Sequence, residues 1–359
     1  YQSALARLIE RFPQTTEANE ARWLLGLARQ REDDASAASA LWEQIPEGHP
    51  RWFEAQMTRA EVRIDAIESS LVEGDQRTAE QQRLEAREAL DQLDAKVTSE
   101  EARADLVLAR ARLETLPNLG DPKRAIDGLE RLLTQPLRPD RRGLAERLRV
   151  LALLELGRSV EAVRVTRALL ESSNPRDLLQ LARRLDQAAV SAPSDLLVRR
   201  FGEVLRMVST HLVEHPRGLS ESLQAEARLR GLRGLVFHGD SGAAREGLKS
   251  WPQALEVLPP EVQPDLARLA LDAGDPQRAL QVNRAILSRQ PAGSRPWLQA
   301  RLGEAEALVE LRELDSARRL LDATATLHPD LGGERLHRRY QALLERLEQE
   351  QAFRSSPHH

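Results

Sequence analysis

Apolar residues along this chain recur every three or four positions, the spacing that places them on one face of an α-helix. Residues 1–12 show the pattern: Leu5, Leu8, Ile9 and Phe12 share a face, and Pro13 then ends the segment. Alternating runs of β-branched residues, the usual sign of a strand, do not occur in the sequence. The pattern therefore predicts an all-α chain. Because this first apolar face lacks a partner helix, we also expect preceding chain or a partner protein to cover it.

A longer pattern is superimposed on the helical one. In the segment 20–50, Gly26, Ala38 and Pro50 follow one another at intervals of twelve residues. This spacing fits two short helices that cross at the small residues, with a proline where the second helix stops. A bulky side chain at the crossing would overpack it. The same spacing returns at Ala267, Ala279 and Pro291 and at Ala305, Ala317 and Pro329, and parts of it return at Gly120 and Ala125 and at Gly157 and Ala162.

With Phe12-Pro13-Gln14-Thr15, Ala18, Ala21, Trp23, Leu25 and Trp42, these landmarks resemble the tetratricopeptide-repeat (TPR) family. The resemblance implies a right-handed α-α superhelix, a TPR-like solenoid, and the repeat-ending prolines divide the chain into about eight or nine helix pairs. Two near copies, Gly120-Asp121-Pro122 and Gly274-Asp275-Pro276, mark where one helix ends and the next begins. There glycine ends the first helix, aspartate caps the second, and proline occupies its first turn.

The regular pattern is interrupted twice. Residues 51–97 carry two long apolar stripes on either side of Gly74-Asp75, which predicts an antiparallel hairpin, either projecting or formed by two ordinary but long repeat helices. Residues 218–264 contain many glycines and prolines, which predicts short, irregular helices and a joint. The predicted order is N-terminal repeats at 1–50, the hairpin at 51–97, middle repeats at 98–217, the joint at 218–264, C-terminal repeats at 265–331, a capping helix at 332–351 and a tail at 352–359.

The amino-acid composition limits the kinds of partner and binding site that the chain can have. The formal charge of −4 provides no general attraction for nucleic acid, so we expect no nucleic-acid partner. The chain has no cysteine, which excludes disulfides and thiolate metal sites. No apolar run is long enough to span a membrane, which leaves peripheral membrane association as the only membrane contact compatible with the pattern. Of 52 basic residues only three are lysine (Lys96, Lys123 and Lys249), a bias that we attribute to a GC-rich genome.

Catalytic motifs are missing from the sequence. There is no Gly-x-Ser-x-Gly nucleophile motif and no phosphate-binding loop of the Gly-x-x-x-x-Gly-Lys type. His211 and His215 lie four residues apart and could chelate a metal, but His49, His215 and His328 each precede a repeat-ending proline. We interpret these histidines as helix C-terminal residues favoured by the helix dipole. The sequence therefore predicts no metal, no cofactor and no enzymatic activity.

Candidate binding residues follow from the resemblance, since TPR proteins bind peptides or protein surfaces along the concave face of successive first helices. Trp23, Arg110 and Arg147 occupy equivalent inward positions, so the two arginines could bind an acidic segment. The alternative pairs them with Glu114 and Glu146, and places Trp23 in the core with Trp42. Trp251, next to Pro252, is a candidate exposed anchor.

These features favour a non-catalytic scaffold that binds other proteins within a larger, bacterial multi-subunit assembly. The alternative is a regulatory module that senses a peptide or other ligand. The opening pattern around Phe12-Pro13 is similar to that of bacterial envelope TPR proteins, which favours the periplasmic side of the cell envelope over the cytoplasm.

Overall fold

The computed structural model describes residues 1–32, 34–73 and 75–355. In these residues the secondary structure is entirely helical, without a strand, as the sequence predicts. The chain divides into two compact units, Tyr1–Val165 and Thr166–His359. Each unit is a TPR-like array of consecutive helix pairs.

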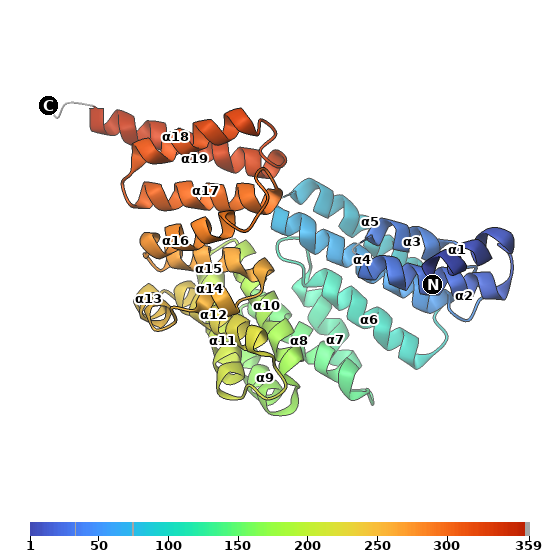
Figure 1. The fold of residues 1–359 in the computed structure, drawn as a ribbon. Helices are drawn as coiled ribbons and strands as arrows, with labels where there is room; N and C mark the ends of the chain where they lie inside the picture. Colours follow the sequence, from blue (N-terminus) through green and yellow to red (C-terminus); the bar gives the residue numbers. More distant parts are fainter. Residues whose placement is uncertain (33, 74, 356–359) are drawn as a thin grey trace. The chain divides into compact units, whose positions relative to one another are not determined.

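The N-terminal unit consists of helices that follow one another through short turns, and neighbours along the chain pack together (Figure 1). Its last helix, α9, continues across the unit boundary. The helices are α1 (Gln2–Arg11), α2 (Thr16–Arg31), α3 (Ala35–Glu43), α4 (Trp52–Glu73), α5 (Gln76–Asp94), α6 (Glu100–Glu114), α7 (Pro122–Leu133), α8 (Pro139–Glu155) and α9 (Ser159–Ser172).

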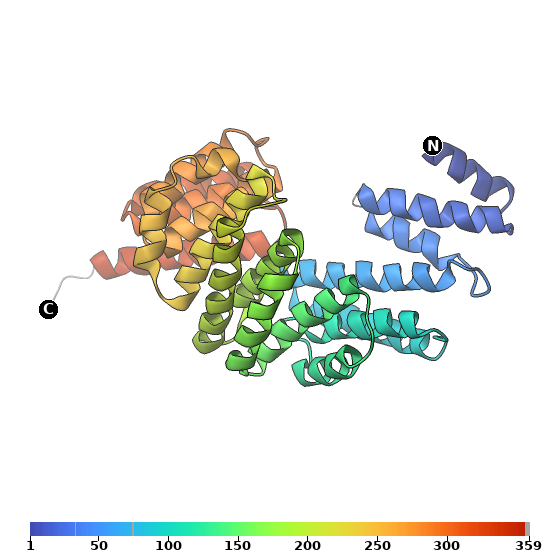
Figure 2. The same cartoon turned by 90° about the horizontal axis from the view of Figure 1, so that it is seen from below.

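The C-terminal unit repeats this arrangement, and Figure 1 shows α16, α17 and α18 stacked as successive rows. Figure 2 shows the same helices from below, with α19 (red) partly hidden behind the orange helices. The helices are α10 (Pro175–Ser191), α11 (Asp195–Glu214), α12 (Glu221–His238), α13 (Ser241–Lys249), α14 (Ala254–Val257), the 3-10 turn η1 (Pro260–Val262), α15 (Gln263–Asp272), α16 (Pro276–Leu287), α17 (Arg295–Glu310), α18 (Leu314–Leu327) and α19 (Glu334–Ser355).

The predicted caps form where the sequence places them. The side chain of Asp121 accepts hydrogen bonds from the backbone N–H groups of Lys123 and Arg124, and Asp275 accepts one from Arg278. In both helices the following proline occupies the first turn, where its missing N–H costs no hydrogen bond. These local signals therefore fix the starts of α7 and α16.

The small residues at the helix crossings are buried. Ala38, Ala279 and Ala317 are fully covered, and Gly26 lies against the indole of Trp42. Trp42 is itself fully buried, and its Nε1 donates a hydrogen bond to the backbone oxygen of Trp23 at 3.3 Å. The crossing therefore has room for the large side chain of Trp42 because residue 26 is a glycine.

The segment 51–97 forms the long helices α4 and α5, which pack against each other. Their buried side chains, such as Ile64, Ile67 and Leu90, share one core with Leu106 and Leu113 of α6. The pair is thus packed onto the next repeat, as the alternative of ordinary but long repeat helices requires. Of the predicted turn, Gly74 lies outside the described residues, and the side chain of Asp75 caps α5 by accepting from Thr78.

The expectation of an irregular joint over 218–264 needs correction. Its first half is the regular 18-residue helix α12, and Gly231 and Gly234 lie inside this helix rather than in a loop. Gly234 has a packing role there, because its missing side chain permits close backbone contact with Gly202 and Arg206 of α11. Irregular structure is confined to the short elements between Lys249 and Gln263. The last helix, α19, also continues to Ser355, beyond the predicted start of the tail, and residues 356–359 lie outside the described residues.

Candidate functional site

The first helices of successive pairs lie next to one another in each unit. In the C-terminal unit these are α10, α12, α15, α17 and α19, and each contacts the next. We call the surface that they form the A-helix face. Its polar side chains come from different repeats, so the stacking of the helices, rather than local sequence, decides which charges meet.

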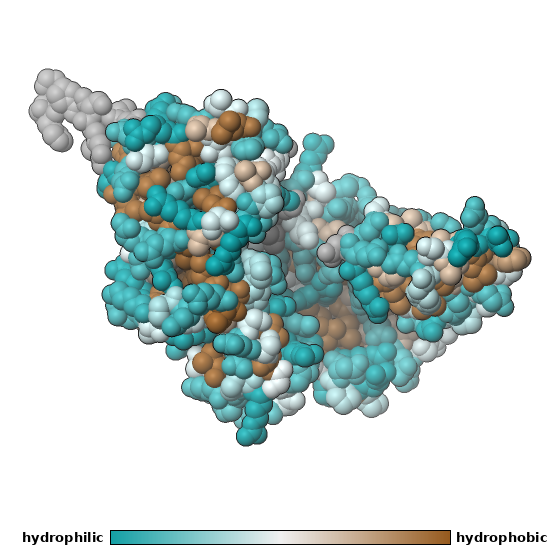
Figure 3. Space-filling model, in the orientation of Figure 1, coloured by the Kyte–Doolittle hydropathy of each residue, from teal (hydrophilic) through white to brown (hydrophobic). Residues whose placement is uncertain are grey.

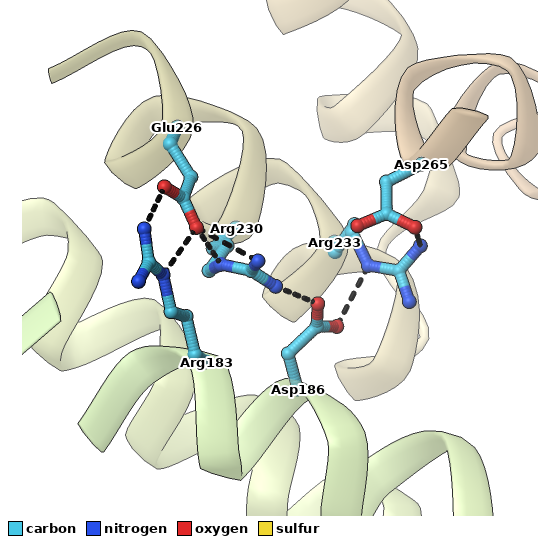
Figure 4. Close-up of polar contacts among 6 residues, drawn as sticks. All are labelled: Arg183, Asp186, Glu226, Arg230, Arg233 and Asp265. Atoms are coloured by element: carbon cyan, nitrogen blue, oxygen red, sulfur yellow. Dashed lines mark hydrogen bonds and ion pairs between the residues drawn. The ribbon is translucent and has the colours of Figure 1, made fainter. Parts of the chain in front are cut away.

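A buried group of charged residues links α10 to α12 (Figure 4). Asp186 lies between two guanidinium groups: it binds Arg230, and it accepts a hydrogen bond from Nε of Arg233 at 2.7 Å. Glu226 accepts hydrogen bonds from Arg230 at 2.8 and 3.0 Å, and from Arg183 at 2.6 and 2.8 Å. Asp186, Glu226, Arg230 and Arg233 are each no more than 8% exposed. Arg183 is the exception, with a side chain that is 47% exposed. We call these four residues and Arg183 the buried charge network.

The network satisfies its own charges. Burial opposes ionisation of Glu226, but the hydrogen bonds from Arg183 and the charge of Arg230 outweigh it and lower the pKa of this carboxyl. Burial likewise opposes the charge of Arg233, but the carboxylate of Asp186 raises its pKa above the ordinary value. These ionised, mutually paired groups hold α10 and α12 together and offer no reactive group to a substrate.

At the edge of the network, Asp265 of α15 lies 4.0 Å from Nη1 of Arg233 (Figure 4). This separation gives weaker compensation than the contacts of Asp186, and burial raises the pKa of Asp265. Asp265 therefore ionises less readily than an ordinary aspartate, whereas Glu226 ionises more readily than an ordinary glutamate.

Farther along the A-helix face the charges reach solvent. Glu306 of α17 lies 2.9 Å from Nη2 of Arg339 on α19 and 3.9 Å from Nη1 of Arg268 on α15. Arg346 donates to Glu310 at 3.0 Å. These side chains line a hollow of about 380 Å³ together with the apolar residues Leu271, Ala342 and Leu343 and with Asp272. Arg268, Arg339 and Arg346 have side chains that are 46–55% exposed, unlike those of Arg230 and Arg233 in the buried charge network.

The N-terminal unit has the same construction between its own first helices. Arg112 of α6 binds Asp65 and, at 3.1 Å, Glu68, both on α4. Arg141 of α8 forms a two-pronged contact with Asp105 of α6, with distances of 2.6 and 2.7 Å. Paired arginines thus bridge neighbouring first helices in both units. The pairs of Arg112 and Arg141 leave no local signal in the sequence, because the partners are 36 to 47 residues apart along the chain.

The predicted groove residues do not come together. Trp23 is 6% exposed and packs with Trp42, with ring centroids 5.8 Å apart, which supports its assignment to the core. Arg110 pairs with Asp91 and Asp94 of α5 at 2.7 and 2.9 Å, rather than with Glu114. Arg147 is buried within α8 at 8% exposure.

The expectation that Trp251 is an exposed anchor is wrong. Trp251 is only 6% exposed and belongs to the core of the C-terminal unit, with Leu248, Ala254 and Leu258. The guanidinium of Arg228 lies 4.8 Å from the centre of its ring. The proline that follows Trp251 suggested a loop, but the short α14 folds that loop back over the core, so the indole points inward.

The histidines and carboxylates of the described residues were the candidates for a metal site. Within the described residues, no group of three or more histidine, aspartate or glutamate side chains could hold a metal ion. His211 and His215 stack with ring centroids 4.4 Å apart, and Nδ1 of His215 lies 3.2 Å from the backbone oxygen of His211. Burial and the neighbouring His215 lower the pKa of His211. In the same part of the chain, no helix combines the length and the apolar character that crossing a bilayer requires.

Comparisons with known proteins return helical-repeat structures at low similarity. No protein-family model and no curated protein matches the chain. Among solved structures it is similar to a Rap protein complexed with competence and sporulation factor, at 12% identity over 81% of this chain and 80% of that one, with a TM-score of 0.37. It is also similar to the apo form of the quorum sensor NprR from B. thuringiensis, at 15% identity over 79% of this chain and 80% of that one, with a TM-score of 0.34. Yeast Tom70 is similar at 14% identity over 99% of this chain and 97% of that one, with a TM-score of 0.35. At these scores the likenesses add no functional evidence, and the TPR-like arrangement rests on the helices themselves.

Proposed function

We propose that this chain is a non-catalytic protein-interaction scaffold, a subunit or segment of a larger assembly, and that the A-helix face of its C-terminal unit binds an extended, charged segment of a partner protein. One observation carries the proposal: the hollow over α15, α17 and α19 is lined by exchangeable ion pairs above apolar side chains. That the assembly is bacterial is supported only by the opening pattern around Phe12 and Pro13.

Exposed ion pairs suit such binding. A solvent-exposed arginine–carboxylate pair contributes only about 0–1 kcal/mol to stability, so a partner's charges can replace it at little cost. Arg339 and Glu306 meet this condition, whereas the buried charge network does not, since separating its members leaves a buried charge without compensation. The buried charge network therefore stabilises the packing of α10 against α12, and the hollow over α15, α17 and α19 is the binding surface.

The hydropathy of the surface agrees with a polar partner. In Figure 3 hydrophilic residues cover most of the visible surface of the C-terminal unit, with hydrophobic residues in separate patches among them. A partner segment that follows α15, α17 and α19 would place charged side chains against Arg268, Arg339 and Arg346, and a short apolar side chain against Leu271 and Leu343. Charge complementarity of this kind determines specificity and association rate.

The test is affinity purification of the intact chain from its source, followed by mass spectrometry. Arg339→Ala removes the central bridge of the hollow, and Arg318→Ala removes an exposed arginine that pairs with Glu348 away from the hollow. We expect stoichiometric partners with the native chain and the Arg318 variant, and their loss with the Arg339 variant. Equal retention by both variants would refute the assignment of the surface. A chain that purifies alone and whose melting temperature rises with a peptide would instead support the sensing alternative.

A further inference from the structure

A second pocket lies in the N-terminal unit, between α4 and the two helices that contact it, α3 and α5. It encloses about 210 Å³. Its lining contains three cationic side chains, Arg59, Arg63 and Lys96, but a single carboxylate, Glu43; the remaining lining residues are Trp52, Gln56, Ala60, Ala89, Gln92 and Leu93. The pocket thus has an excess of positive charge in a chain whose net charge is −4.

Two of the three cations are already engaged. Arg59 binds Glu43 at 3.0 Å and Gln56 at 2.8 Å. Lys96 binds Glu47 at 2.6 Å, and its Nζ lies 5.0 Å from the centre of the Trp52 ring. Both side chains are therefore held in place at the walls of the pocket.

Arg63 differs from them. It lies four residues after Arg59 on α4, so both guanidinium groups face the same side of the helix. Among residues 1–32, 34–73 and 75–355, none forms a hydrogen bond or ion pair with the half-buried side chain of Arg63. A partly desolvated guanidinium without a counter-charge is one that an incoming anion stabilises.

We infer that this pocket binds a carboxylate side chain from an acidic segment of a partner polypeptide, with Arg63 as its main contact. Glu43 shows the mode of binding, since its exposed carboxylate already pairs with Arg59 at 3.0 Å in this pocket. The indole of Trp52 offers an apolar wall for the methylene groups of such a side chain, and Gln92 adds an amide donor. This site is separate from the A-helix face and does not depend on the function proposed for it.

The test is fluorescence anisotropy of labelled hexaglutamate with the intact chain at low ionic strength, where surface electrostatics are least screened. Arg63→Gln removes the guanidinium charge that the proposal makes the main contact. Arg87→Gln is the matched control, since Arg87 is also a half-buried arginine of the same helix pair but does not line the pocket. Losing one charge-assisted contact should weaken binding about tenfold in the Arg63 variant, while the control stays within about twofold.

Glu43→Gln should act in the opposite direction. It removes the carboxylate that competes for Arg59, so hexaglutamate should bind more tightly, and a folding defect cannot imitate that gain. Equal weakening in the Arg63 and Arg87 variants, or no gain in the Glu43 variant, overturns the inference. Inorganic phosphate is the competitor: displacement of the peptide by equimolar phosphate would reassign the pocket to a free oxyanion. The Arg339 variant should bind hexaglutamate like the native chain, which separates this test from that of the A-helix face.

Discussion

Replacing Asp186 with asparagine tests whether the buried charge network holds the C-terminal unit together. Asp186 is 3% exposed and binds both Arg230 and Arg233. In the variant Arg230 keeps Glu226 at 2.8 Å, but Arg233 keeps only Asp265, at 4.0 Å. One buried guanidinium therefore loses its close counter-charge.

The expected cost follows from that geometry. Removing one partner of a buried ion pair costs about 3–5 kcal/mol, because the remaining charge stays desolvated without compensation. The matched control is Asp272→Asn, since Asp272 pairs at 3.0 Å with Arg268, whose side chain is 55% exposed. An exposed pair of that kind is worth about 0–1 kcal/mol.

The assay is urea unfolding of the intact chain, monitored by far-ultraviolet circular dichroism. We expect the Asp186 variant to shift the transition of the C-terminal unit to much lower urea concentration, and the Asp272 variant to leave it nearly in place. A loss below about 1 kcal/mol in the Asp186 variant would refute the reasoning, because it would mean that the network is effectively solvated. A separate transition for the N-terminal unit should be unaffected in either variant.

Two further predictions concern the N-terminal unit. A Cβ atom on Gly26 would lie 2.6 Å from Cε2 of the buried Trp42, so Gly26→Ala should lower the unfolding free energy by about 1–3 kcal/mol in urea titrations. Gly128→Ala is the control, since its Cβ would meet only Val107 at 3.7 Å; stabilisation by both substitutions would contradict the packing argument. Burial raises the pKa of Glu155, at the end of α8, to about 8, so the folded state holds a proton there that the unfolded state releases above its ordinary pKa of 4.5. Its contribution to stability is therefore present at low pH and is lost as pH rises toward 8. Glu155→Gln should raise the urea midpoint at pH 8.5 but not at pH 5, and a pH-independent effect would show that this carboxyl ionises normally.

The sequence by itself determined the all-α, TPR-like class and many helix ends, because these depend on interactions within a few residues. Apolar spacing marks the buried face of each helix, and the Gly-Asp-Pro signals at 120–122 and 274–276 fix where helices stop and start. The buried alanines at the crossings, such as Ala38 and Ala279, follow from the twelve-residue spacing.

Only the tertiary structure decided which charges pair and which aromatic side chains are buried. Arg233 meets Asp186 across 47 residues, and Arg183 meets Glu226 across 43, because stacking aligns the first helices of neighbouring repeats. Nothing local distinguishes these arginines from Arg63, for which the same stacking brings no counter-charge from the part of the chain that the structure describes. Trp251 is buried by helices that precede and follow it in the chain, although Pro252 suggested a loop. Local preferences act over one or two helical turns, whereas the register between helices forms only when whole repeats pack.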